Sequence, residues 1–128
     1  MTQFLGGEIV KMDSILNTIK KACNVAEDDT SFDTDLIMYT NSVFMNLSQI
    51  GMVQADNFSI ANSSTTWDAL LPEDDSLIAV QTYISLKVRT LFDPPASSAA
   101  MEAINKTIAE LEWRINGKTD IYKEEDDG

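Results

Sequence analysis

A run of carboxylates early in the chain is the first group of residues that could do chemistry. It comprises Glu27, Asp28, Asp29, Asp33 and Asp35, and clustered acids are typical of calcium sites. An EF-hand loop also needs a glycine at its turn and regularly spaced acids that end in a glutamate, and this run has neither. Paired carboxylates are plentiful in any chain this acidic, so they do not indicate a glycosidase. We therefore predict no metal site here.

Other residue types that carry chemistry are few. The chain contains no histidine, which excludes His-based triads, histidine acid–base catalysis and the commoner zinc sites. Its single cysteine, Cys23, lies on the apolar stripe of a predicted helix, where a buried structural thiol is favoured over a nucleophile. Neither GxxxxGKS/T nor GxGxxG, the standard phosphate-binding loops, occurs. We predict that the protein is not an enzyme and has no cofactor.

Charge is distributed unevenly over the 128 residues, whose net charge is −12. Residues 25–75 contain ten acids and neither lysine nor arginine. Such a chain repels phosphate backbones, because nucleic-acid-binding proteins need Lys and Arg to release counterions. No apolar run approaches the roughly 20 residues that span a bilayer, and the first residues lack the features of a signal peptide. These features predict a soluble intracellular protein with no specific DNA binding and no membrane association.

Four stretches with a helical period are expected to position these residues. Apolar residues recur at intervals of three and four in 14–24, 33–50, 74–92 and 97–116. In the second stretch, Asp33 is expected to cap the helix, with Phe32 and Ile37 as a hydrophobic staple. Residues 52–72 lose the period, and their FSI and TTW segments could pair as short strands. We predict an all-α fold, a small bundle of about four helices with a loop or short β-hairpin insertion between the second and third.

The whole chain, residues 1–128, is expected to form a single domain. Residues 1–11 are predicted to be a flexible extension and 12–117 the helical domain. The fourth helix is expected to end at Asn116-Gly117. Residues 118–128 are predicted to be an acidic tail, which is too polar to fold alone.

Two consecutive prolines separate the last two helical stretches in the segment LFDPPASS. Each proline biases the residue before it toward an extended conformation, so the third helix is expected to end near Phe92. Asp93, Pro94 and Pro95 would then form a short, stiff joint, and either of the following serines can cap the fourth helix. An ordinary interhelical turn is compatible with the same residues.

Some apolar residues exceed what a self-contained monomer needs. Methionines recur every seven residues along the second helix, away from its main stripe; methionine is common at adaptable contact surfaces but also fills cores. Trp113 lies on the polar face of the fourth helix, where it is either covered by the tail or contacts another subunit. The candidate subunit or partner contacts are Met38, Met45, Met52, Trp67 and Trp113.

Three stretches, taken in this order, resemble a known family. They are DSILNTIKKACNVAEDDTSFDTDLIMYTNSVFMNLSQIG, SLIAVQTYISLKVRTLFDPPASSAAMEAIN and ELEWRIN. Over about residues 12–117 the chain is similar to the head–tail connector proteins, also called adaptor or head-completion proteins, of long-tailed bacteriophages and prophages. No single motif carries the resemblance, which depends on several stretches in the right order.

The resemblance implies a structural protein of the virion that is assembled in the host cytoplasm. It would form a ring of about 12 subunits through head-to-tail contacts, located under the portal protein. That ring would extend the DNA channel and offer a platform to downstream head-completion or tail proteins. The resemblance also implies that the carboxy-terminal part reaches toward the portal, with Ile121 and Tyr122 as anchors.

In such a ring, acids that face the channel would keep passing DNA from binding to the wall. We expect Asp28, Asp29, Asp33 and Asp35 to have this role, which their replacement by Asn and a measurement of DNA retention at low salt would test. The residues alone leave two other classes open. An acidic DNA mimic would inhibit a nucleic-acid-binding enzyme, and a small helical regulatory module would act as a monomer or dimer.

Overall fold

The computed structural model describes residues 11–72 and 77–127, with side chains as far as Gly117. The helices are α2 (Ile15–Ala22), α3 (Asp33–Gln49), α4 (Trp67–Leu70), α5 (Leu77–Phe92) and α6 (Ser98–Asp127), with a 3-10 turn, η2, at Val53–Ala55. Over these residues there is no strand and one isolated bridge, between Ser14 and Thr66. The predicted all-α bundle is confirmed, and the alternative of a β-hairpin insertion is wrong.

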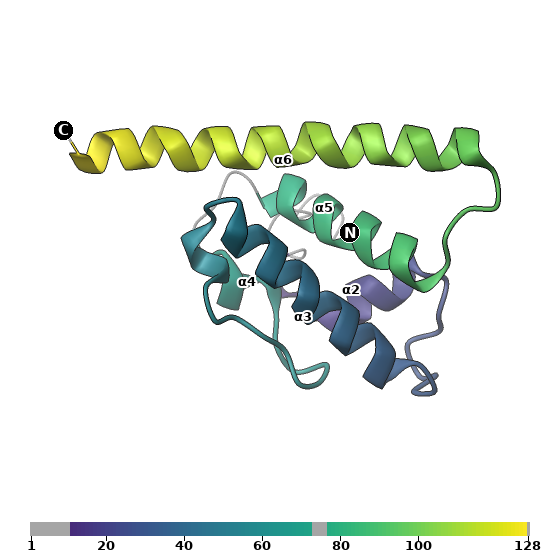
Figure 1. The fold of residues 1–128 in the computed structure, drawn as a ribbon. Coiled ribbons are helices and arrows are strands. Elements are labelled where there is room, and N and C mark those ends of the chain that lie inside the picture. The colour runs from purple at the N-terminus through teal and green to yellow at the C-terminus, as the bar shows by residue number, and fades with distance from the viewer. Residues whose placement is uncertain (1–10, 73–76, 128) are drawn as a thin grey trace, which may run out of the picture.

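Helix α5 is the centre of the fold. It contacts α2, α3 and α6, and α6 lies along its outer side as a cover over the smaller bundle (Figure 1). Val80, Tyr83, Ile84 and Val88 of α5 are buried in the core. A helix that is apolar over so much of its circumference needs cover on several sides, and its central position supplies that cover.

The first two helices begin differently from each other. Ser14 caps α2, since its hydroxyl accepts a hydrogen bond from the backbone N–H of Asn17 at 3.1 Å. Helix α3 begins at Asp33 itself, and Phe32 occupies the capping position without a side-chain hydrogen bond. The prediction that Asp33 caps α3 is therefore wrong. Its carboxylate instead forms an ion pair with Lys20, 2.8 Å away.

The segment between α3 and α5 is irregular but tied to the bundle. Gly51 has a φ of 108°, a left-handed conformation that reverses the chain after α3. Farther on, the side-chain amide of Asn41 bonds both the backbone N–H (2.9 Å) and the carbonyl (3.1 Å) of Ile60. Because Asn41 takes these groups and Trp67 begins α4, the FSI and TTW segments do not pair as strands.

Helix α6 is longer than predicted. It begins after Ser97, whose hydroxyl accepts the backbone N–H of Ala100 at 3.0 Å, and it continues through Gly117 to Asp127. The predicted end at Asn116-Gly117 is wrong, because glycine ends a helix only where it adopts a left-handed conformation, and of the described glycines Gly51 alone does so. No helix in the described part of the chain has the length and apolarity needed to cross a bilayer.

Candidate functional site

The outer face of α3 exposes two of the three predicted methionines. Met38 and Met45 are 58% and 63% exposed, and their spacing of seven places them one above the other, roughly opposite the buried stripe of α3. Met52 is buried. It lies beyond the end of α3, where the Gly51 reversal and a bond from its N–H to the carbonyl of Leu47 (3.0 Å) turn it into the core. Met52 is therefore not a surface contact.

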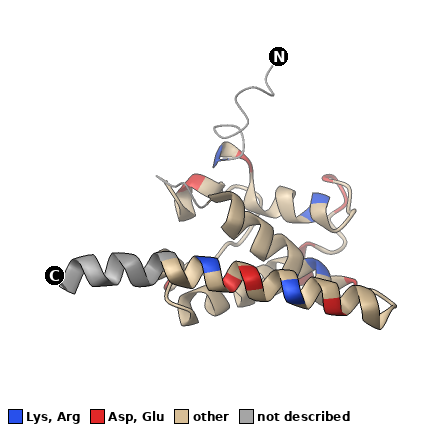
Figure 2. Cartoon of the chain, turned by 90° about the horizontal axis from the view of Figure 1, so that it is seen from above, with Lys and Arg blue, Asp and Glu red and all other residues tan. Residues whose placement is uncertain are grey.

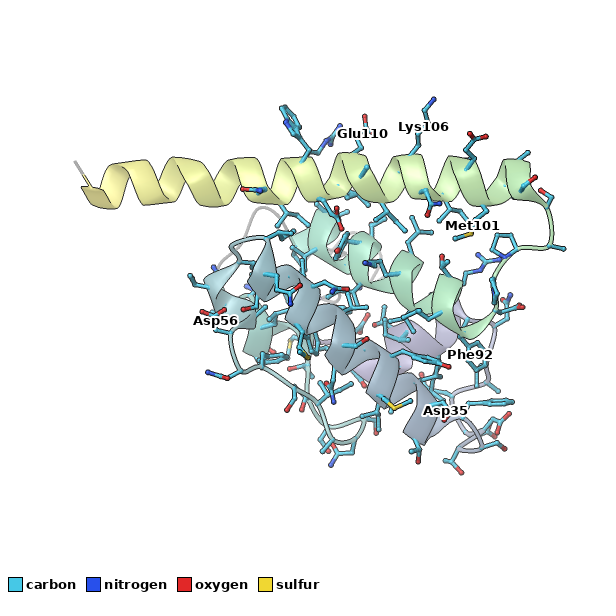
Figure 3. All side chains as sticks on the ribbon, in the orientation of Figure 1. Asp35, Asp56, Phe92, Met101, Lys106 and Glu110 are labelled. Carbon is cyan, nitrogen blue, oxygen red and sulfur yellow. The ribbon has the colours of Figure 1, made fainter. Side chains whose placement is uncertain are left out.

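The outer face of α6 carries the most exposed large apolar side chain in the described residues. Trp113 is 76% exposed, so no described segment covers it. Lys106 and Glu110 point away from the bundle while Met101 points toward it (Figure 3). Trp113 follows Lys106 by seven residues and so shares its outward face. A shallow depression of about 620 Å³, lined by Ala99, Glu102, Ala103, Asn105, Lys106 and Ala109, runs along the same helix.

Trp67, also predicted as a contact, has a structural role instead. Its side chain is fully buried, and its indole N–H donates to the hydroxyl of Thr18 at 3.0 Å. This bond fastens the start of α4 to α2 and helps to hold the 52–72 segment in place. Its burial removes Trp67 from the surface candidates.

The carboxy-terminal candidates are Ile121 and Tyr122. Both positions lie on the backbone of α6. Their side chains lie outside the described residues.

The proline joint connects α5 and α6 so that they run side by side in opposite directions (Figure 1). Helix α5 ends at Phe92 as predicted, and the N–H of Asp93 closes its last turn on the carbonyl of Arg89 at 2.7 Å. Phe92 packs edge-to-face against Phe32, with ring centroids 5.2 Å apart. Pro94 is exposed and Pro95 half-buried. The joint is thus anchored by Phe92 on the loop before α3.

The four predicted channel acids have unequal surroundings. Asp28 and Asp35 are exposed. The hydroxyl and the backbone N–H of Ser31 bond Asp29 and hold the pKa of its carboxyl below the usual value. Asp33 is 28% exposed and neutralises the buried Lys20, so it is not a free surface acid. Among described residues, no group of three or more His, Cys, Asp or Glu could hold a metal ion.

Cys23 lies in the core, as expected for a structural thiol. Its side chain is buried beneath the end of α2, and desolvation raises the pKa of the thiol, although Arg89 opposes this. A raised pKa keeps the sulfur protonated and unreactive at neutral pH.

Sequence reasoning missed two features that involve basic residues of α2. Lys20 is buried between α2 and the start of α3. Its burial could have been predicted from its position four residues after Leu16, which places it on the apolar stripe of α2. Lys21 and Arg89 line a common groove between α2 and α5. No local pattern could have joined these two, because they lie far apart in the chain.

The chain also matches a known protein family. The model of the phage connector protein family matches residues 15–121. The chain belongs to this family. The match covers the bundle, the 52–72 segment, the proline joint and most of α6, so the predicted resemblance is confirmed. Neither the curated proteins nor the solved structures gave a significant match.

Family membership defines the broad role of the chain. It is a connector, a structural component of the phage virion that serves at the head–tail junction.

Proposed function

We propose that this connector assembles into a ring of about 12 copies under the portal protein. The ring extends the DNA channel and gives downstream head-completion or tail proteins a platform. A closed ring needs a heterologous interface, in which two different faces of each subunit meet. The observation that carries the proposal is that the chain exposes large apolar side chains on more than one helix. Among them are Trp113 on α6 and the pair Met38 and Met45 on α3.

These two faces are suited to meet between neighbouring copies. Trp113 is the kind of large aromatic anchor that dominates protein interfaces, where its truncation typically costs about 2 kcal/mol or more. Met38 and Met45 offer a flexible apolar surface that can adapt to such a ring system. Each face lies opposite the buried stripe of its own helix, so both stay accessible in the folded monomer.

The acids of the loop before α3 and of the first turn of α3 support a conduit for DNA rather than a DNA-binding site. Asp28, Asp29 and Asp35 would face the channel and repel the phosphate backbone. Asp33 is left out because it neutralises Lys20. Connector-family membership also favours this function over an acidic DNA mimic or a monomeric regulatory module. Ile121 and Tyr122 remain the proposed anchors on the portal.

Native mass spectrometry of the full chain, alone and with the portal protein, tests the proposal. We expect a ring from the wild type, and its loss in Trp113→Ser and in Met45→Ser. Val53→Ser is the matched control, because Val53 is also an exposed apolar residue but lies on neither face. A wild-type chain that stays monomeric even with the portal would contradict the ring. Rings from Trp113→Ser would exclude the α6 face as the contact.

A further inference from the structure

A groove between α2 and α5 carries positive charge in an otherwise acidic protein. It has a volume of about 400 Å³ and is open to solvent. Its lining residues are Thr18, Lys21, Ala22, Gln81, Thr82, Ser85, Leu86 and Arg89. This lining contains two cations and no carboxylate. Lys21 and Arg89 are both exposed, and the one ion pair in the described part of the chain involves neither of them.

Two other cations of the bundle have partners close by. Lys20 is paired with Asp33. Lys87 donates to the side chain of Asn46 at 3.1 Å and lies over the ring of Tyr83. On α6, acidic and basic residues alternate along the part whose side chains are described (Figure 2). Lys106 and Arg114 there each have a glutamate four residues before them. The groove therefore differs from these sites in bringing two exposed cations together in a lining without a carboxylate.

Carboxylates also lie near the groove but outside its lining. Lys21 borders a smaller hollow that contains Asp13 and Glu27, and Asp93 follows Arg89 by one turn. None of their carboxylate oxygens lies within 4 Å of a side-chain nitrogen of Lys21 or Arg89. They leave room for an incoming carboxylate between the two helices.

An acidic segment of matching charge lies at the end of the same chain. Residues 124–127 read Glu-Glu-Asp-Asp, and the last thirteen residues have a net charge of −3. Helix α6 carries this segment past the edge of the bundle (Figure 1). Charge complementarity therefore points to the acidic end of α6 as the occupant of the groove.

The segment cannot reach the groove of its own copy. Arg89 lies three residues before the end of α5, so the groove extends to the end of the molecule where the proline joint lies and α6 begins. The 30 residues of α6, at 1.5 Å each, put its acidic end about 45 Å from that joint. A contact between the two must join opposite ends of two different copies. Such a head-to-tail contact is the type that closes a ring.

We infer that the groove lined by Lys21 and Arg89 in one copy binds the acidic end of α6 of the next copy. The inference rests on the proposed ring and adds a second, ionic contact to the apolar one. The ionic contact fixes the head-to-tail orientation of neighbouring copies. It weakens as the salt concentration rises, because exposed charges are screened.

Charge reversal tests the pairing directly. A groove-reversed variant carries Lys21→Glu and Arg89→Glu, and a tail-reversed variant carries Glu124→Lys and Glu125→Lys. Each substitution changes the charge by two, so the net charges are −16 and −8 against −12 for the wild type. We expect each variant alone to lose at least nine-tenths of its rings in native mass spectrometry. An equimolar mixture should recover them, because each reversed groove then receives a reversed tail.

Each outcome of this experiment decides a separate point. Normal rings from the groove-reversed variant would overturn the inference and leave the proposed function standing. Failure of the mixture and of the combined four-substitution chain would overturn it as well, once circular dichroism shows that both variants fold.

A wild-type chain that never assembles would contradict the proposed function, and a peptide then tests the pairing by itself. A fluorescent peptide of residues 116–128 is titrated onto the full chain and followed by anisotropy. Binding at least tenfold weaker to the groove-reversed variant supports the groove, whereas equal binding overturns it.

Discussion

Replacing Asp33 with Asn should destabilise the monomer more than its position on the first turn of α3 suggests. Lys20 is 2% exposed, and its Nζ lies 2.8 Å from Oδ1 of Asp33. The same Nζ also donates to the backbone carbonyl of Glu27 at 3.0 Å. In Asp33→Asn the buried ammonium keeps this neutral acceptor but loses its counter-ion.

The expected cost follows from the burial of the two partners. Removing one member of a buried ion pair costs about 3–5 kcal/mol, because the other charge stays uncompensated. Asp33 is 28% exposed, so water can reach its side of the pair, and we reduce the cost to about 2 kcal/mol. Loss of the interaction with the α3 dipole adds about 0.3–1 kcal/mol. Asp35→Asn measures this dipole contribution alone, because Asp35 lies in the same turn and forms no ion pair within the described residues.

Urea unfolding followed by circular dichroism measures the difference. With a slope of about 2 kcal/mol per molar urea, which is ordinary for a chain of this size, Asp33→Asn should lower the midpoint by about 1 M or more. Asp35→Asn should lower it by less than half as much. Lys20→Met in the Asp33→Asn background replaces the ammonium with an apolar side chain of similar length, so most of the lost stability should return.

Two results would refute this reasoning. Equal midpoints for Asp33→Asn and Asp35→Asn would show that the ion pair does not stabilise the fold. A double variant as unstable as Asp33→Asn alone would show that the loss does not come from an uncompensated Lys20 charge. The expected pattern would establish that Asp33 stabilises the monomer and is not a free channel acid.

Two further predictions concern α6. Gly117→Ala should raise the helix content and the stability by about 0.5–1 kcal/mol, because a methyl at Gly117 meets nothing within 4 Å; lower ellipticity at 222 nm would instead place the helix end there. The hydroxyl of Tyr83 donates to Glu112 at 2.8 Å, and burial, with this bond, raises the pKa of Tyr83 well above its usual value of 10.0. Because the folded chain holds this proton more tightly than the unfolded chain, its stabilising effect is complete below about pH 10 and declines above it. Tyr83→Phe should lose about 1 kcal/mol at pH 7 and show a smaller decline in urea midpoint between pH 9 and pH 11; parallel wild-type and variant curves would contradict the assignment.

The elements governed by local chemistry could be predicted from the sequence. The apolar period located α2 and α3, and the rule that a proline excludes the residue before it from a helix placed the end of α5 at Phe92. These signals lie within a few residues of the features they determine. The resemblance of several ordered stretches gave the family, which no single motif could have given.

The errors arose where distant residues decide the local structure. Asp33 was predicted as a cap because a cap is a local feature, but Lys20 of another helix takes its carboxylate. The seven-residue period was extended to Met52, although the reversal at Gly51 ends the helix before it. Paired strands were predicted as one alternative for the 52–72 segment. The side chain of Asn41, 19 residues before Ile60, instead bonds the backbone N–H and carbonyl of Ile60. Neither the spacing of apolar residues nor a helix-capping rule contains information about partners that lie far away in the sequence.

The same distinction separates the residues that fold the subunit from those proposed to assemble it. Asp33 lies against buried Lys20, so its loss should lower the urea midpoint of the monomer. Trp113 is 76% exposed, so Trp113→Ser should leave the free energy of unfolding within about 0.5 kcal/mol of the wild type while it abolishes the ring. If Trp113→Ser lowered both, its loss of rings would reflect unfolding, and the α6 face would have no support as a contact. Measuring the midpoint and the oligomer on the same variants therefore decides which surface belongs to assembly.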